Sequence, residues 1–143
     1  MTLMIKKSDL QALFDHCLAG APNEACGMLG GRNGRVEQVY CMTNAQPGTD
    51  YYEMDPGEQF RVMKNIREAG LELIGLFHSH PHSQAYPSSV DVNQAYWPGT
   101  QLPNYPNALY VIVTLMDRAK PAARAFSLSE GKIIEVPVHV DDV

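Results

Sequence analysis

Residues 73–91 read LIGLFHSHPHSQAYPSSVD and join a strand-like apolar run to a group of metal-ligating side chains. Leu73–Phe77 has the apolar character of a strand buried inside a sheet. His78 and His80 follow two residues apart, so both imidazoles point to one face of an extended segment, with about 6.5–7 Å of backbone rise between them. Open sheets place their functional sites at such strand ends. The segment therefore predicts a site at the end of a buried strand.

His78, His80 and Asp91 can bind a single cation if the loop that separates the histidines from the aspartate folds back. Zn–N bonds are about 2.0–2.1 Å long, so two imidazoles on one face can converge on zinc. Three protein ligands and a vacant fourth position are typical of catalytic zinc. One carboxylate and two neutral imidazoles leave the dication with a net positive charge, which is enough to acidify a bound water. The spacing thus favours a catalytic zinc site over a structural one.

The same residues have an alternative interpretation that involves no chemistry. A lone His-x-His pair is more often a surface feature than a metal site. Ser88-Ser89-Val90-Asp91 is also a capping box, with Ser88 as N-cap and Asp91 reaching back from the third helical position. The two interpretations are compatible, because a helix that begins here would hold Asp91 rigidly and aim it.

Composition indicates one globular domain and excludes some classes of partner. The chain has 143 residues, of which 45% are hydrophobic and 19% charged, with a net charge of −5. This charge, without a basic cluster, argues against a nucleic-acid partner. No apolar stretch approaches the roughly 18 residues of a membrane span, and residues 1–10 lack the apolar core of a signal peptide. Three irregularly spaced cysteines favour buried, reduced thiols and a cytoplasmic location.

Periodicity predicts a mixed α/β sheet with helices packed on it. Strands are expected at 3–5, 26–29, 36–42, 51–54, 73–77, 107–116, 122–128 and 132–138, and helices at 8–19, 56–69 and 89–96. Ser8 and Gln11 are expected to form a capping box on the first helix, and Asp55 to be the N-cap of the second. The buried face of the second helix is expected to consist of Phe60, Met63 and Ile66.

The segment from His78 to Asp91 resembles the signature of the JAMM (MPN-plus) metalloprotease family, including the serine at position 88. The family's remaining motif residue is a glutamate near the start of the second strand. Glu24, in the stretch PNEACGMLGG, is similar to it. The resemblance implies one JAMM/MPN-plus catalytic domain over 1–143, with the MPN (cytidine-deaminase-like) fold. That fold is a mixed, curved β-sheet flanked by about three helices.

The resemblance also implies a role for each motif residue. His78, His80 and Asp91 would hold one zinc ion, with water as its fourth ligand. Glu24 would be the general base, which takes a proton from that water without touching the metal. Ser88 would donate a hydrogen bond to the carbonyl oxygen as negative charge develops there. For Ser88, a role as N-cap and nothing more remains the alternative.

Several other polar residues lie outside the pattern and receive no role. Ser79 is expected to point to the opposite face of its strand and to be structural. His82 lies close to the ligands, and His16 and His139 are expected at the surface. The loop 97–106 is rich in proline and aromatic residues. It is either an irregular connection packed on its own rings or a wall of the substrate groove.

In size and in its Glu-x-Cys-Gly segment, the chain is most similar to small prokaryotic members of the family, which process ubiquitin-like sulfur carriers. The resemblance implies a zinc-dependent peptidase or isopeptidase that cleaves after a carrier's C-terminal Gly-Gly. Composition argues against nucleic acid and membrane as partners. A noncatalytic MPN binding module and a general zinc peptidase remain the alternatives. The sequence leaves open the cognate carrier, the group released and the oligomeric state.

Overall fold

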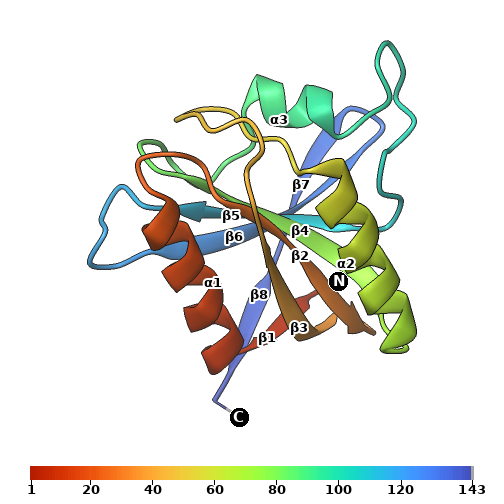
Figure 1. Cartoon of the computed structure of the whole chain (residues 1–143), viewed down its shortest axis with the longest axis horizontal. Coiled ribbons are helices and arrows are strands. Elements are labelled where there is room, and N and C mark those ends of the chain that lie inside the picture. Colours follow the sequence, from red (N-terminus) through yellow and green to blue (C-terminus); the bar gives the residue numbers. More distant parts are fainter. Residues whose placement is uncertain (143) are drawn as a thin grey trace.

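The computed structural model describes residues 1–142, which form an eight-stranded sheet, two long helices and one short helix (Figure 1). Val143, the last residue of the expected domain, lies outside the described residues. The strands are β1 (Leu3–Lys6), β2 (Cys26–Arg32), β3 (Arg35–Met42), β4 (Glu72–His80), β5 (Leu109–Thr114), β6 (Ala122–Ser129), β7 (Lys132–Val136) and β8 (Val138–Asp141). The helices are α1 (Lys7–Gly20), α2 (Pro56–Glu68) and α3 (Ser89–Gln94).

The sheet is mixed, with the strand order β7-β6-β5-β4-β2-β3-β1-β8. The motif strand β4 lies in its interior, antiparallel to β2 and parallel to β5. β2 and β3 are joined by a tight turn at Asn33-Gly34, where both residues have positive φ, as a two-residue hairpin turn requires. The mixed, curved α/β sheet flanked by three helices is therefore confirmed over residues 1–142.

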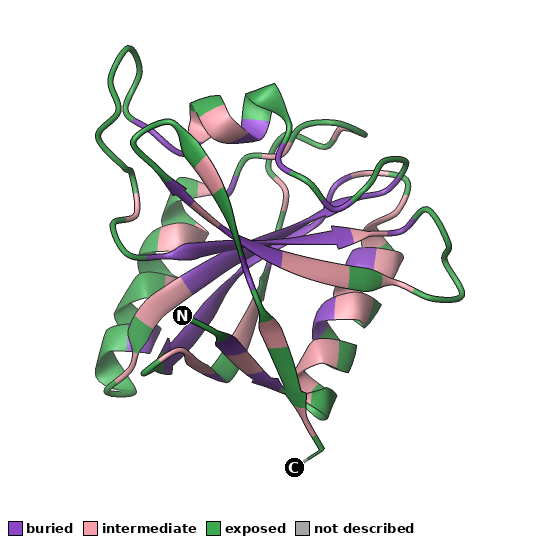
Figure 2. Ribbon diagram, turned by 180° about the vertical axis from the view of Figure 1, so that it is seen from behind, coloured by how far each residue is buried: buried purple, intermediate pink, exposed green. Residues whose placement is uncertain are grey.

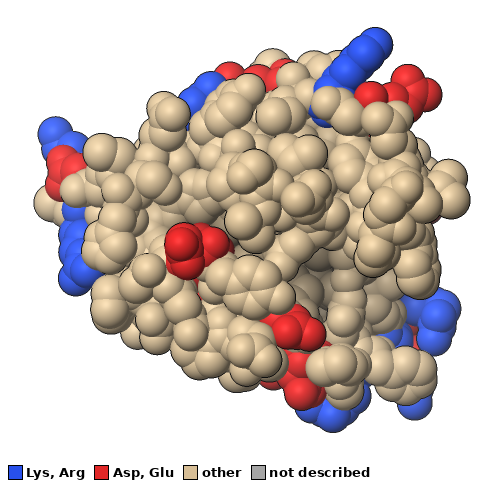
Figure 3. Space-filling view, turned by 90° about the horizontal axis from the view of Figure 1, so that it is seen from above, with Lys and Arg blue, Asp and Glu red and all other residues tan. Residues whose placement is uncertain are grey.

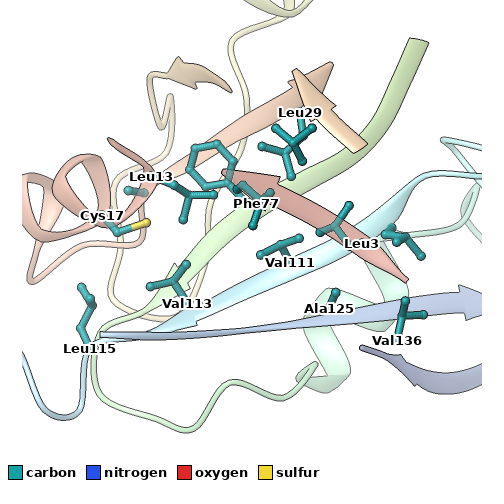
Figure 4. Packing of buried hydrophobic residues seen from close by; sticks show 14 residues of the cluster. Leu3, Leu13, Cys17, Leu29, Phe77, Val111, Val113, Leu115, Ala125 and Val136 are labelled. Carbon is teal, nitrogen blue, oxygen red and sulfur yellow. The ribbon is translucent and has the colours of Figure 1, made fainter. Parts of the chain in front are cut away.

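The two long helices cover opposite faces of the sheet, as the two opposed views of Figures 1 and 2 show. Alternation along β4 separates two apolar clusters, because successive side chains point to opposite faces. Phe77 belongs to the cluster under α1, together with Leu13 and Cys17 of that helix (Figure 4). Leu76 belongs to the cluster under α2, together with Ile66. The motif strand is thus packed on both faces, which holds its last residues rigid.

Several sequence-based expectations about the helices and strands are wrong. Ser8 and Gln11 form no capping box, because β1 runs directly into α1 and Ser8 already lies within the first turn; the N-cap is Lys6, without a side-chain hydrogen bond. Residues 51–54 are not a strand and contribute only an isolated bridge between Met54 and Asn44. The expected strand 132–138 is divided into β7 and β8, and β8 pairs with β1 at the far edge of the sheet.

The second helix is confirmed in its start but not in its buried face. The side chain of Asp55 accepts a hydrogen bond from the backbone of Glu58 at 2.9 Å, as an N-cap does. Phe60 and Met63 are exposed, and of the three residues expected on the inner face only Ile66 is buried. Within residues 1–142, no helix is both long enough and apolar enough to cross a membrane.

Gly27 marks a close approach between β2 and both neighbouring strands, β3 and β4. A Cβ atom at this position would overlap with the ring of Phe77 and the backbone oxygen of Tyr40. We expect Gly27→Ala to lower the free energy of unfolding by about 2 kcal/mol, because overpacking a dense core displaces both neighbours. Urea unfolding measures this change. Gly48→Ala is the control, since its Cβ would lie 3.6 Å from the nearest atom; equal stability of the two variants would contradict the expectation.

Candidate metal centre and active site

The three predicted ligands converge on one buried point at the end of β4. His78 Nε2 and His80 Nε2 lie 3.2 Å apart. Asp91 brings Oδ1 to 3.2 Å from His78 Nε2 and Oδ2 to 3.0 Å from His80 Nε2. All three residues are buried, and their ligand atoms lie within 4.8 Å of one another. The residues predicted from spacing are therefore close enough to share a single cation.

Local structure explains how Asp91 reaches the histidines. Ser88 is the N-cap of α3, and its Oγ accepts a hydrogen bond from the Asp91 backbone at 3.1 Å. In return, Asp91 Oδ2 accepts one from the Ser88 backbone at 2.9 Å. The capping box is thus present and aims the carboxylate at the site, so the capping and ligand interpretations of this segment both fit the geometry.

A backbone carbonyl fixes the orientation of the His80 ring. His80 Nδ1 lies 2.8 Å from the oxygen of Gln84 and can donate a hydrogen bond only if it carries the proton. Nε2 is then the unprotonated nitrogen of the neutral ring, and it faces a carboxylate oxygen of Asp91. Two acceptors at this distance repel each other unless a proton or a metal cation lies between them, so a bound cation would take the place of the proton that Nε2 donates to Asp91 in the metal-free site. This donor set of two imidazoles and one carboxylate fits zinc.

Electrostatics at the triad favour ionised Asp91. Burial by itself would raise the pKa of Asp91, but hydrogen bonds from His78 and His80 hold it well below its usual range. For His80, burial lowers the pKa, while Asp91 and the Gln84 carbonyl raise it by a larger combined amount. The carboxylate therefore keeps the negative charge that a dication needs.

Glu24 lies beside the triad in the segment that precedes β2. The register between Cys26 and His78 brings this segment next to the end of β4. Glu24 is 4% exposed, and its Oε1 is buried without a hydrogen-bond partner among the described residues. Burial raises the pKa of Glu24 to about 8, with smaller upward contributions from Asp91 and Asp50 and a downward one from His80. A dication at the triad would favour the charged form.

A small hollow of about 220 Å³ is lined by polar residues that include Glu24, His80 and Ser88. Ser88 is exposed, and its Oγ is held by the Asp91 backbone. The hollow is completed by Thr49, Asp50, His82 and Ser83. The five motif residues thus meet at one place, with Glu24, His80 and Ser88 reachable from solvent.

A larger groove of about 790 Å³ lies near the triad and reaches β4 at Leu76, two residues before His78. Tyr52 links the two, because it lines this groove and its ring stacks on His78 with centroids 4.8 Å apart. The loop 97–106 supplies one wall of the groove through Trp97, Pro98, Tyr105 and their neighbours. Sequence reasoning missed Tyr52, since an aromatic residue in an irregular segment carries no periodic signal.

Figure 3 shows the end of the molecule that carries α3, seen from above. Lys and Arg side chains lie around its rim, and Asp and Glu side chains occur both at the rim and nearer the middle, beside a hollowed area. Acidic side chains beside a hollow give it a negative potential, which favours a bound cation.

The remaining histidines and cysteines only partly match expectation. His139 and His82 are exposed. His16 is half-buried rather than at the surface, and its Nε2 lies 3.0 Å from the Cys26 oxygen and 3.1 Å from the Met42 oxygen, so it ties α1 to β2 and β3. The free cysteines Cys17 and Cys26 are buried as expected, but Cys41 is exposed.

Comparisons with known proteins give a consistent result. A model of the prokaryotic homologs of the JAB domain matches residues 6–129. The CysO-cysteine peptidase of Mycobacterium tuberculosis is 34% identical over 140 residues, covering 96% of this chain and 90% of that protein. A probable TtuB-protein conjugate cleaving protease of Thermus thermophilus is 31% identical over 139 residues, covering 96% and 84%. A solution structure from Desulfitobacterium hafniense superposes with a TM-score of 0.85 at 31% identity, covering 100% and 94%.

Proposed function

This chain belongs to the family of prokaryotic JAB-domain (JAMM) proteins, and on that premise we propose that it is a zinc-dependent peptidase or isopeptidase, which hydrolyses the bond after the C-terminal Gly-Gly of a ubiquitin-like sulfur-carrier protein. The observation that carries the proposal is the buried convergence of His78, His80 and Asp91 beside Glu24. Residues 1–143 would act as one catalytic domain, in the cytoplasm, as the odd cysteine count favours.

The proposed protein ligands of one zinc ion are His78 Nε2, His80 Nε2 and the Asp91 carboxylate. Water would be the fourth ligand. Zinc, when bound, acts as a Lewis acid that lowers the pKa of a coordinated water to about 7. The Gln84 carbonyl keeps the His80 ring in the tautomer that ligation needs. The capping box with Ser88 holds the carboxylate in place.

Glu24 is the proposed general base. Its Oε1 is buried and accepts no hydrogen bond from the described residues, so it can accept a proton from the attacking water. The same carboxyl group would then hand that proton to the departing amine. Burial raises the pKa of Glu24 to about 8, and a bound dication would lower it again towards neutrality, so neither proton transfer is strongly uphill near neutral pH.

Ser88 is the proposed oxyanion donor. Its oxygen accepts from the Asp91 backbone, which leaves its hydroxyl hydrogen to donate to the carbonyl oxygen of a substrate. Its exposure at the mouth of the small hollow supports this role, since the donor has to meet a substrate that arrives from solvent.

The two hollows suggest the direction in which a substrate lies. Glu24 must be near the departing nitrogen, and it lines the small hollow, so the released group belongs there. The tail of the carrier then lies on the opposite side, in the larger groove beside Tyr52. We expect the tail to run extended, because its peptide groups need hydrogen-bond partners once water is excluded, and strand addition provides them.

A cleavage experiment tests the substrate class. Little room for side chains is expected where the tail approaches the metal between Glu24 and Ser88, so glycine should be required just before the scissile bond. We expect a carrier with a C-terminal extension to be cut once, after the second glycine. An Ala-Ala version should react at least tenfold more slowly, which corresponds to about 1.4 kcal/mol of lost transition-state fit. Mass spectrometry identifies the products.

The outcomes separate this proposal from its alternatives. Equal cleavage of both versions, or cuts scattered along the tail, would indicate a general zinc peptidase instead. Tight binding of the carrier without any cleavage by the zinc-loaded protein would indicate a noncatalytic binding module. The complete set of five motif residues argues against the module, because a purely binding domain has no use for a metal site with a base beside it.

A further inference from the structure

The peptide bond between Glu24 and Ala25 is held at both of its polar atoms by side chains. Its carbonyl oxygen accepts a hydrogen bond from Asn44 Nδ2 at 3.0 Å. Its N–H group donates to Ser79 Oγ at 2.8 Å. The two side chains come from different parts of the fold, since Ser79 lies on β4 and Asn44 follows β3.

The neighbouring backbone groups are paired as well. The Glu24 N–H donates to the Gly48 carbonyl at 2.8 Å, and the Ala25 carbonyl accepts from the Ser79 N–H at 3.0 Å. All four backbone polar groups of Glu24 and Ala25 therefore have partners, although both residues precede β2. An irregular segment would otherwise be free to rotate at this point.

Ser79 connects the metal ligands to this segment. It stands between His78 and His80 in the sequence but is fully buried, and its hydroxyl binds the Ala25 N–H. The alternation of side chains along a strand makes this possible, because the histidines face the site while the residue between them faces away. The spacing between the ligand strand and the Glu24–Ala25 backbone is thus set by two contacts of Ser79, one through its backbone N–H and one through its hydroxyl.

Asn44 connects the same peptide bond to the loop 45–53. Its Oδ1 accepts from the backbones of Gln46 and Glu53, each at 3.0 Å, and its Nδ2 also donates to the Tyr51 oxygen at 3.3 Å. This loop carries residues that line both hollows. Asn44 therefore fills all its hydrogen-bonding positions in ordering the substrate-side loop against Glu24.

We infer that Ser79 and Asn44 are positioning residues that clamp the Glu24–Ala25 peptide bond and thereby aim the Glu24 carboxylate at the reacting water; this inference rests on the proposed role of Glu24 as general base. Oε1 of Glu24 has no partner of its own among the described residues, so the direction of the side chain depends on its backbone. A base acts only within hydrogen-bond reach of its proton, and a misplacement of about 1 Å can cost 10²-fold in rate.

Two variants each break one of the two side-chain contacts with this peptide bond. Ser79→Ala removes the acceptor for the Ala25 N–H. Asn44→Asp keeps the Oδ1 acceptor for Gln46 and Glu53, but it removes the Nδ2 donor to the Glu24 carbonyl and to the Tyr51 carbonyl. For each variant we expect kcat on a carrier with a C-terminal extension to fall at least tenfold, with KM within threefold of wild type and an unchanged zinc content. Ser79→Thr keeps the hydroxyl and should restore kcat. Gln46→Ala, an exposed residue of the same loop, is the matched control.

A second readout does not depend on activity. In the metal-free protein, the Ala25 amide should exchange its hydrogen slowly, and Ser79→Ala should accelerate that exchange at least tenfold without changing the exchange of amides in the middle of β5. Equal Ala25 exchange in wild type and Ser79→Ala would overturn the clamp.

Combining Ser79→Ala or Asn44→Asp with Glu24→Gln shows whether Ser79 and Asn44 act by positioning Glu24 or only by stabilising the fold. If Ser79 and Asn44 act through Glu24, each variant should lower the residual rate of Glu24→Gln by less than twofold. An undiminished tenfold effect in that background would contradict the inference. If Glu24→Gln itself turned over normally, the proposed base would be wrong, whereas an inactive Glu24→Gln with fully active Ser79→Ala and Asn44→Asp would overturn the clamp alone.

Discussion

Replacement of Glu24 by glutamine is expected to lower kcat by 10²-fold or more while the zinc content stays that of the wild type. Glutamine has nearly the same size as glutamate and keeps its hydrogen-bonding capacity, but it cannot take a proton at neutral pH. Glu24 makes no contribution to the proposed ligand set, so the metal should remain bound. A loss in kcat with retained metal is the signature of a lost proton acceptor.

The measurement combines kcat on a carrier with a C-terminal extension and elemental analysis of the same protein sample. Glu37→Gln is the control, because it makes the same chemical change at an exposed position on β3 and should leave both quantities unaltered. Normal turnover by Glu24→Gln would mean that another group takes the proton. Loss of zinc from this variant would instead show that Glu24 supports the metal site.

The metal triad was predictable because its information is local. His78, His80 and Asp91 lie within 14 positions of one another, and two regular patterns relate them: the two-residue repeat of a strand and the capping box of a helix. Each pattern fixes the direction of a side chain from neighbouring residues only. Once the loop between His80 and Ser88 folds back, the two imidazoles and the Asp91 carboxylate lie 3.0–3.2 Å from one another.

Glu24 was predictable only through the family resemblance. It lies more than 50 positions before His78 in the sequence, and it reaches the site because β2 pairs with β4 in one particular register. Nothing in the residues around Glu24 specifies that register. The same limitation concealed the contacts that Asn44 and Ser79 make with its backbone, because they too join segments that are distant in sequence.

The errors in the fold also arise from tertiary context. Phe60 and Met63 satisfy a helical period, but α2 meets the sheet through Ile66 and the half-buried Val62, so the helix is rotated away from the expected face. Periodicity predicts that a helix has an apolar stripe, and the neighbouring layer decides which stripe is used. Residues 51–54 have strand-like composition. However, the Glu53 N–H donates its hydrogen bond to the side chain of Asn44, so it is not free to donate to a neighbouring strand.

His80→Ala is expected to reduce the zinc content from about one ion per chain to nearly zero, and to abolish turnover with it. The variant removes one of the three ligands, namely the imidazole whose Nε2 lies 3.0 Å from Asp91 Oδ2. The remaining two ligands form a site of the kind that loses metal readily during purification. Elemental analysis of gently purified protein measures the change, and His139→Ala, an exposed histidine on β8, is the matched control.

Thermal unfolding distinguishes lost ligation from lost folding. The capping box of Ser88 and Asp91 does not involve His80, so α3 should still form in the variant. Metal that binds only the folded state raises stability by RT ln(1 + [L]/Kd), which is about 2.7 kcal/mol at a hundredfold excess over Kd. A chelator should therefore lower the Tm of the wild type, and it should leave the Tm of His80→Ala unchanged. Equal zinc content in the two proteins, or an equal response to the chelator, would show that His80 is not a ligand.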